Sequence, residues 1–162
     1  MKTFVAIDSQ NLYYSARRHS GNGLVDFQKL WDRISDSEKD FLGVVYVVRG
    51  EYDSSSFEGL LRGVGYRISP RTSIKIRDGG KQRVKYDGHE VRITLDAAVT
   101  YQDKYDKFIL ITGDVDYSDL FAVLVKMGKK TEFWSFDRKP HPDLVQVVDK
   151  VVFLDGDLLQ EG

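Results

Sequence analysis

The chain has 162 residues, of which 41% are hydrophobic and 30% charged, and these values indicate one soluble globular domain over residues 1–162. The net charge of -1 provides no overall field for nucleic acid or membrane, so any partner must be recognised by local patches. The absence of cysteine excludes a disulfide scaffold, a thiolate metal site and a cysteine nucleophile. The apolar runs are too short for a signal peptide or a membrane helix, so we expect a cytoplasmic protein with no membrane partner.

Six short apolar runs rich in β-branched residues predict strands. They occupy residues 3–7, 41–48, 66–68, 108–111, 131–134 and 151–154. Between most of them apolar residues recur every three or four positions, which predicts helices whose apolar side chains are core. Examples are the stretch from Leu24 to Ile34 and the set Val91, Leu95, Ala98 and Val99. This alternation predicts an α/β, Rossmann-like three-layer sandwich with a mostly parallel central sheet.

One segment interrupts the alternation. Residues 74–77 and 82–86 alternate apolar with polar side chains on either side of Asp78-Gly79-Gly80-Lys81, which predicts a β-hairpin insertion projecting from the sheet. The hairpin is basic and has tyrosines beside it, so we interpret it as a wall that binds single-stranded nucleic acid. The alternative is a solvated hairpin whose charges protect a sheet edge. The candidate RNA-binding residues are Arg17, Arg71, Lys75, Arg77, Lys81, Arg83 and Lys85.

Two of the predicted strands run into acidic turns. The first strand is followed by Asp8 and Asn11, and the fourth core strand by Asp114 and Asp116. In an open α/β sheet the binding crevice forms outside the carboxyl ends of the strands, so both turns are expected at one site. Clustered carboxylates repel one another unless a cation joins them, and hard oxygen ligands suit Mg²⁺ or Mn²⁺. The sequence therefore predicts a divalent metal centre.

Two further acids, Glu90 and Asp96, flank the start of the helix predicted from residue 91. Either is a candidate for a middle metal ligand, although a carboxylate at a helix start is also stabilised by the helix dipole. The three histidines lie in polar, loop-like surroundings, and His89 is the one expected closest to the acids.

Three motifs together resemble a known family. Asp8-Ser9-Gln10-Asn11-Leu12-Tyr13 resembles the N-terminal signature of NYN domains, the LabA-like branch of the PIN-fold nucleases. Thr112-Gly113-Asp114-Val115-Asp116-Tyr117 resembles the second signature, usually Ser-Gly-Asp-Ser-Asp-Phe. The middle motif, typically Lys-Gly-Val-Asp and then Asp-Ala, differs here, because it reads Asp87-Gly88-His89-Glu90 and then Asp96-Ala97. The resemblance extends roughly over positions 3 to 136.

The resemblance implies a PIN-like fold and a metal-dependent endoribonuclease that uses Mg²⁺ or Mn²⁺ and cleaves single-stranded or structured RNA. It also allows a homodimer. By carry-over, the implied catalytic residues are Asp8, Asn11, Asp96, Asp114 and Asp116. The implied metal ligands are Asp8, Asp114 and Asp116, with Asp96 or Glu90 as the middle acid.

The carboxylates are chemically sufficient for this reaction, because bound divalent ions activate water and neutralise charge on a phosphoryl group without a histidine base. The alternative is a PIN-like module that binds RNA or protein with weak or lost catalysis, which Glu90 in the middle motif favours slightly. A phosphatase of the haloacid dehalogenase type requires an acid at position 10, which is Gln. No glycine-rich nucleotide-binding loop follows the first strand.

Overall fold

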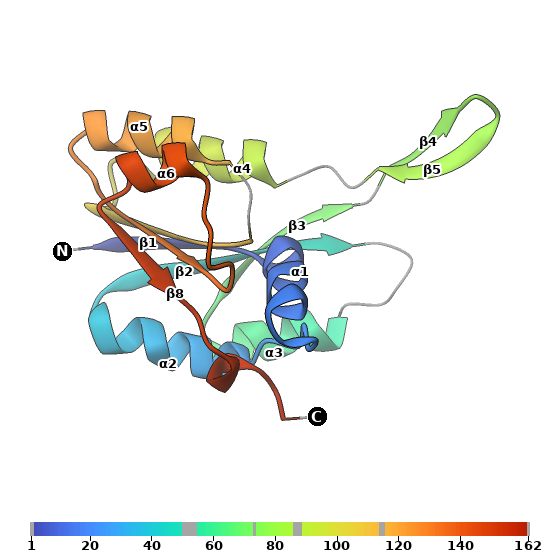
Figure 1. The fold of residues 1–162 in the computed structure, drawn as a ribbon, viewed down its shortest axis with the longest axis horizontal. Helices are drawn as coiled ribbons and strands as arrows, with labels where there is room; N and C mark the ends of the chain where they lie inside the picture. The colour runs from blue at the N-terminus through green and yellow to red at the C-terminus, as the bar shows by residue number, and fades with distance from the viewer. Residues whose placement is uncertain (1, 50–54, 73, 86–88, 114–115, 162) are drawn as a thin grey trace.

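The computed structural model describes residues 2–49, 55–72, 74–85, 89–113 and 116–161. Its centre is a six-stranded sheet in the order β3-β2-β1-β6-β7-β8, in which every neighbouring pair is parallel. Figure 1 shows this sheet between two layers of helices. The strands are β1 (Thr3–Asp8), β2 (Phe41–Arg49), β3 (Arg67–Thr72), β6 (Lys107–Ile111), β7 (Lys130–Ser135) and β8 (Lys150–Phe153).

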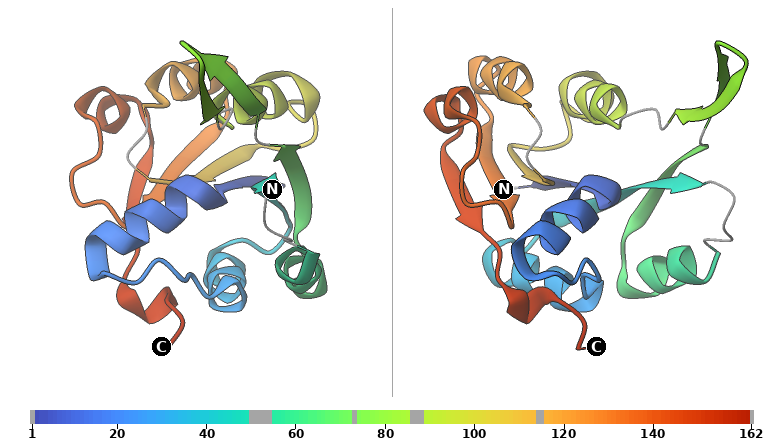
Figure 2. Two further views of the ribbon diagram at one scale, coloured as in Figure 1. Left: turned by 90° about the vertical axis from the view of Figure 1, so that its right-hand side faces the viewer. Right: turned by 45° about the vertical axis from the view of Figure 1, so that its right-hand side comes forward.

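Helices cover both faces of the sheet, so the α/β three-layer prediction is confirmed (Figures 1 and 2). One layer contains α1 (Ser9–Ser20), α2 (Phe27–Ser37), α3 (Ser55–Val64) and the short turn η2 (Gly156–Leu158). The other layer contains α4 (Glu90–Leu95), its π-helical continuation η1 (Asp96–Thr100), α5 (Ser118–Lys126) and α6 (Pro142–Val147).

The side chains of β1 alternate between the two hydrophobic cores. Val5 and Ile7 pack with α1, α2 and α3, whereas Phe4 and Ala6 pack with α4, α5 and α6. All six residues of β1 are buried, which is typical of a central parallel strand. Since side chains along a strand alternate with a period of two, Asp8 continues the series of Phe4 and Ala6 toward the α4 and α5 layer.

The predicted hairpin forms a separate two-stranded antiparallel sheet of β4 (Ile74–Asp78) and β5 (Lys81–Lys85). Gly79 and Gly80 at its turn have φ angles of 58° and 80°, a region that glycine enters without steric cost. Figure 2 shows the hairpin extending away from the helical layers. Its origin as an insertion into the family fold stays a prediction.

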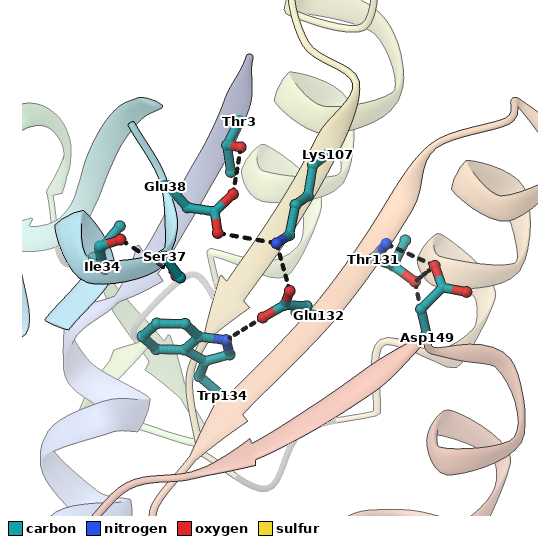
Figure 3. Close-up of polar contacts among 9 residues, drawn as sticks. All are labelled: Thr3, Ile34, Ser37, Glu38, Lys107, Thr131, Glu132, Trp134 and Asp149. Carbon is teal, nitrogen blue, oxygen red and sulfur yellow. Dashed lines mark hydrogen bonds and ion pairs between the residues drawn. The ribbon is translucent and has the colours of Figure 1, made fainter. Parts of the chain in front are cut away.

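A network of buried charged side chains lies at the amino ends of the strands (Figure 3). Lys107 Nζ lies 2.9 Å from Glu38 Oε2 and 2.5 Å from Glu132 Oε2, and Thr3 Oγ1 donates to Glu38 Oε1 at 2.8 Å. Desolvation opposes the charged form of Glu38, but the hydrogen bonds from Lys107 and Thr3 outweigh it and lower the pKa of Glu38. Each acid of this network is therefore engaged by cationic or hydroxyl donors.

The helix predicted from residue 91 buries a different face from the one that its apolar pattern indicated. Val91, Leu95 and Val99 are 63%, 50% and 65% exposed, whereas Ile93 and Ala97 are fully buried. The small side chain of Ala97 allows its turn to approach Tyr105, whose hydroxyl donates to the Ala97 carbonyl at 2.6 Å. Two apolar stripes are present on this helix, and the one that contains Ile93 and Ala97 packs on the sheet.

The helix predicted from Leu24 begins later than expected. Asp26 caps α2 by accepting hydrogen bonds from the backbone N–H groups of Gln28 and Lys29, so the helix starts at Phe27. Leu24 precedes the helix and is 54% exposed. In the described part of the chain, no helix is sufficiently long and apolar to cross a membrane.

Candidate functional site

The two strands that precede the acidic turns are neighbours at the centre of the sheet. β1 pairs in parallel with β6, from Thr3 beside Lys107 to Ile7 beside Ile111. Just beyond β6, Gly113 lies directly against the first turn of α1, because a Cβ built on it would be 2.6 Å from the Asn11 carbonyl oxygen. The carboxyl ends of β1 and β6 therefore meet at α1.

Asp8 is the best-defined acid at this edge. It is only 1% exposed, and its Oδ1 and Oδ2 accept hydrogen bonds from Asn11 N at 3.2 Å and Asn11 Nδ2 at 2.7 Å. Burial raises the pKa of Asp8, the two Asn11 contacts oppose this increase, and the charge of Glu90 adds to it. A buried carboxylate without a cationic partner is costly, so this environment fits a bound cation.

The two candidate middle acids have different surroundings. Glu90 is the first residue of α4, and its charge raises the pKa values of both Asp8 and Tyr117. Asp96 is the first residue of η1, where its Oδ2 accepts a hydrogen bond of 2.7 Å from Tyr46 Oη. Glu90 is therefore electrostatically coupled to Asp8, whereas Asp96 is engaged by a tyrosine of β2.

The second acidic turn is described only at its edges. Asp116 is exposed, and its Oδ1 accepts a hydrogen bond of 2.9 Å from Ser118 N at the start of α5. Hydrogen bonding to the side chain and then to the backbone of Ser118 lowers the pKa of Asp116. Asp114, the other acid of the turn, lies outside the described residues. Among the residues that the structure describes, no three or more histidine, cysteine or acidic side chains gather as a metal site. The predicted centre therefore depends on Asp114.

Asn11 orients the Asp8 carboxylate. Its backbone N–H and its side-chain amide both hold the Asp8 carboxylate at the start of α1. The oxygen donors of Asp8 and Glu90 have the hard character that Mg²⁺ and Mn²⁺ prefer. On this chemistry, and because Asp8 is buried without a cationic partner among the described residues, the residues present fit a divalent ion.

Three buried polar side chains lie among these acids. His89 and Tyr117 are 2% and 3% exposed and Thr112 is fully buried. Within the described ranges, neither His89 nitrogen, nor Thr112 Oγ1, nor Tyr117 Oη has a hydrogen-bond partner. Buried polar groups normally have partners, so these atoms mark a place where a polar ligand or solvent is expected.

The prediction of a polar, loop-like setting for His89 was wrong. Its ring centroid lies 5.9 Å from that of Tyr46. Burial and the charges of Arg71 and Arg92 lower the pKa of His89 to about 4, so the ring is neutral at neutral pH. No local pattern in the sequence indicated this burial, because it arises from the packing of α4 on β2.

The described basic residues lie on two sides of the candidate site. Arg71, near the end of β3, is partly exposed, and its charge acts on His89. Arg17 is exposed on α1. The side chains of the five basic candidates in the hairpin lie outside the described part of the chain, namely Lys75, Arg77, Lys81, Arg83 and Lys85.

Comparisons with known proteins identify both a family and a similar structure. The family profile of the NYN domain matches residues 2–155. A crystal structure of a protein of unknown function from Vibrio parahaemolyticus is 27% identical and superposes with a TM-score of 0.79, covering 98% of this chain and 96% of that chain. No curated protein matches the chain.

Proposed function

Because this chain belongs to the NYN domain family, part of the PIN-like nuclease superfamily, we propose that it is a metal-dependent endoribonuclease. The observation that carries the proposal is the buried Asp8 carboxylate, which has no cationic partner among the described residues and is coupled to Glu90. The proposal assigns the chain to the LabA-like branch and treats residues 1–162 as one domain acting on RNA in the cytoplasm.

The proposed metal ligands are Asp8, Glu90 and Asp114, with Asp96 and Asp116 as further candidates. The described neighbour of Asp114, Gly113, packs on Asn11, which in turn holds Asp8. When bound, Mg²⁺ or Mn²⁺ would acidify a water molecule and neutralise charge on the phosphoryl oxygens.

Protein side chains would supply the remaining contacts. Asn11 fixes the orientation of Asp8 through its amide hydrogen bond. Burial and the charges of Asp8 and Glu90 raise the pKa of Tyr117, so its hydroxyl keeps its proton and can donate to a phosphate oxygen. The proposal assigns phosphate contacts to Arg71, whose charge acts on His89, and to Arg17 in the last turn of α1. The basic hairpin would extend this track.

Cleavage of labelled single-stranded RNA in Mn²⁺ tests the proposal. We expect the wild type to cut internal phosphodiester bonds and Asp114→Asn to lose at least about a hundredfold in rate, because a metal ligand is removed. Asp143→Asn, an exposed acid of α6, is the matched control and should retain wild-type activity. Equal cleavage by wild type and Asp114→Asn would refute the proposal.

A second candidate function is a PIN-like module that binds RNA or protein without efficient cleavage. Glu90 supports this candidate, because its side chain is one methylene longer than the aspartate usual in the family and can move a bound ion. RNA binding without Mn²⁺-dependent cleavage by the wild type would favour this module over the nuclease.

A further inference from the structure

A pocket of about 250 Å³ opens in the layer of α1, α2 and α3, on the other face of the sheet from the layer toward which Asp8 points. Ser9, the residue directly after Asp8, forms part of its lining. The aromatic rings in the lining come from three different helices: Tyr13 of α1, Phe27 of α2 and Phe57 of α3. Figure 2 shows these helices gathered near the C-terminus. The pocket is therefore assembled by tertiary packing.

Phe27 is a rigid element of the pocket. It is only 7% exposed, and its ring packs edge-on against Phe57 at 5.4 Å and against Tyr66 at 6.0 Å between centroids. Tyr66 Oη also donates to the Phe27 carbonyl at 2.8 Å. These contacts fix both the backbone and the ring of Phe27 before any ligand binds.

Tyr13 and Phe57 present open aromatic surface, since each is 38% exposed. The segment before α2 lies directly on the Tyr13 ring, because a Cβ built on Gly23 would be 2.6 Å from a ring carbon. Only glycine allows this approach, so the ring is supported from one side. Exposed and supported aromatic rings are suited to stacking against a flat ligand.

The rim also contains polar groups of the C-terminal segment. The side chain of Gln160 borders the pocket, while its backbone N–H donates to the Leu24 carbonyl at 2.7 Å and its carbonyl accepts from Asn22 Nδ2 at 2.9 Å. Gln160 Nε2 donates to the Val25 carbonyl at 3.5 Å, which leaves one N–H of the amide and its Oε1 for the edge of a ligand. The pocket thus combines flat apolar surface with directional polar groups.

Positive charge lies next to the pocket on α3. Glu58, which follows Phe57, is 3% exposed and accepts hydrogen bonds of 2.6 Å and 3.0 Å from Arg49 at the end of β2. Arg62 Nη2 lies 3.6 Å from the same Glu58 carboxylate. The two arginine side chains remain 47% and 58% exposed, so this cluster has a net positive charge that faces solvent. It complements a phosphate backbone passing the pocket.

We propose that this pocket binds one unstacked base of the RNA strand whose phosphodiester lies at the metal centre. The inference rests on the proposed function for its ligand, and Ser9, which follows Asp8 in the chain and lines the pocket, links the two places. Single-stranded RNA is generally recognised by bases that leave the stack and pack on aromatic side chains. The pocket has room for a single base, and the arginines at Glu58 would contact the adjoining phosphate.

The test measures binding of a fluorescent single-stranded RNA by anisotropy in EDTA, where cleavage cannot interfere. A set of oligonucleotides carries one abasic ribose at successive positions. We expect one position to weaken wild-type binding about tenfold, and Phe57→Leu to weaken binding of intact RNA by a similar factor. In Phe57→Leu the abasic ribose should not weaken RNA binding further, because the contact between the base and the Phe57 ring is already lost.

Phe153→Leu is the matched control, since Phe153 is a 44% exposed phenylalanine on β8. It should bind every oligonucleotide as the wild type does. Thermal melting checks each variant, and Tyr13→Leu replaces Phe57→Leu if the latter unfolds. Independently, RNA with 4-thiouridine at the sensitive position should cross-link to Tyr13, Phe57 or Gln160.

Independent losses from the abasic ribose and Phe57→Leu would overturn the proposal, as would cross-links confined to the hairpin. A change in self-association of Phe57→Leu without coupling to the base would identify the pocket as a contact between copies and also overturn it. These measurements require no cleavage. A protein that shows the coupling but does not cleave RNA would therefore refute the proposed nuclease activity and still support base binding by the pocket.

Discussion

Tyr46 Oη donates a hydrogen bond of 2.7 Å to Asp96 Oδ2, which ties β2 to the first turn of η1. Burial and the Asp96 carboxylate together raise the pKa of Tyr46, so the hydroxyl remains a donor throughout the physiological range. Glu90, six residues earlier in the chain, instead acts on the charge of Asp8. The two acids that the sequence left as alternatives therefore have different surroundings, since Asp96 accepts a hydrogen bond from Tyr46 and Glu90 acts on the charge of Asp8.

We predict that Glu90→Gln weakens Mn²⁺ binding by about tenfold or more, because it removes a charged oxygen ligand beside Asp8. Asp96→Asn should change Mn²⁺ affinity by less than about threefold and instead reduce stability by about 1–2 kcal/mol, because the Tyr46 hydrogen bond loses its charged acceptor. Isothermal titration calorimetry and urea unfolding measure the two effects. The opposite ranking of metal affinities would assign the middle ligand to Asp96.

Asp8→Asn is expected to stabilise the metal-free protein at neutral pH by about 0.5–2 kcal/mol, because removal of a buried charge outweighs the loss of one of the two Asn11 hydrogen bonds. The folded-state pKa of Asp8 is raised, so its stabilising protonated form predominates at low pH and is lost as the pH rises through that pKa. Wild type and variant should therefore differ less in acid.

Mn²⁺ provides the matching test for Asp8. It should raise the melting temperature of the wild type, because the folded state alone presents the site, and leave Asp8→Asn unchanged. Differential scanning calorimetry with and without Mn²⁺ measures both effects. An equal Mn²⁺ shift in the two proteins would show that the ion binds elsewhere.

Gly113→Ala is predicted to destabilise the protein by about 1–3 kcal/mol, because the added methyl group would meet the Asn11 carbonyl oxygen at 2.6 Å. It should also displace the second acidic turn from α1 and reduce cleavage more than substrate binding. Gly59→Ala on α3 is the control, since a methyl group added there would meet no atom within 4 Å. Wild-type stability and activity of Gly113→Ala would show that this contact does not position the site.

The sequence predicted the six strands of the parallel sheet, because short apolar runs alternate with helices, and it predicted that the two acidic turns lie at the same edge of the sheet. It did not predict the burial of His89 and Tyr117. These side chains are polar and lie beside charged motifs, and their burial depends on how α4 and α5 pack over β2. Local sequence patterns do not predict that packing.

The choice of the buried face of the helix that contains Val91 has a similar explanation. Spacing of three and four describes both the exposed set of Val91, Leu95 and Val99 and the buried pair Ile93 and Ala97. The choice between them depends on volume available against Tyr105 and Phe4, which only the assembled sheet determines. The aromatic pocket was not predicted for the same reason, because its rings come from three separate helices.

At the opposite edge of the sheet, Glu38→Gln should reduce stability at pH 7 by about 1–2 kcal/mol, since it weakens contacts with Lys107 and Thr3 that water partly screens. The folded-state pKa of Glu38 is lowered, so its stabilising contribution is present above its unfolded pKa and is lost as the pH falls through the folded one. Urea unfolding should show a smaller difference in stability between the wild type and Glu38→Gln in acid than at pH 7. A constant difference would exclude ionisation of Glu38 as its source.

The proposed nuclease requires Asp8, Glu90 and Asp114 to share one divalent ion, and anomalous diffraction from a Mn²⁺-soaked crystal can locate that ion. We expect an anomalous peak about 2.0–2.6 Å from carboxylate oxygens of Asp8 and Asp114, with Glu90 as a further ligand. A fully occupied peak away from Asp8, or Asp8 and Asp114 carboxylates too far apart to bind one ion, would refute the shared metal centre.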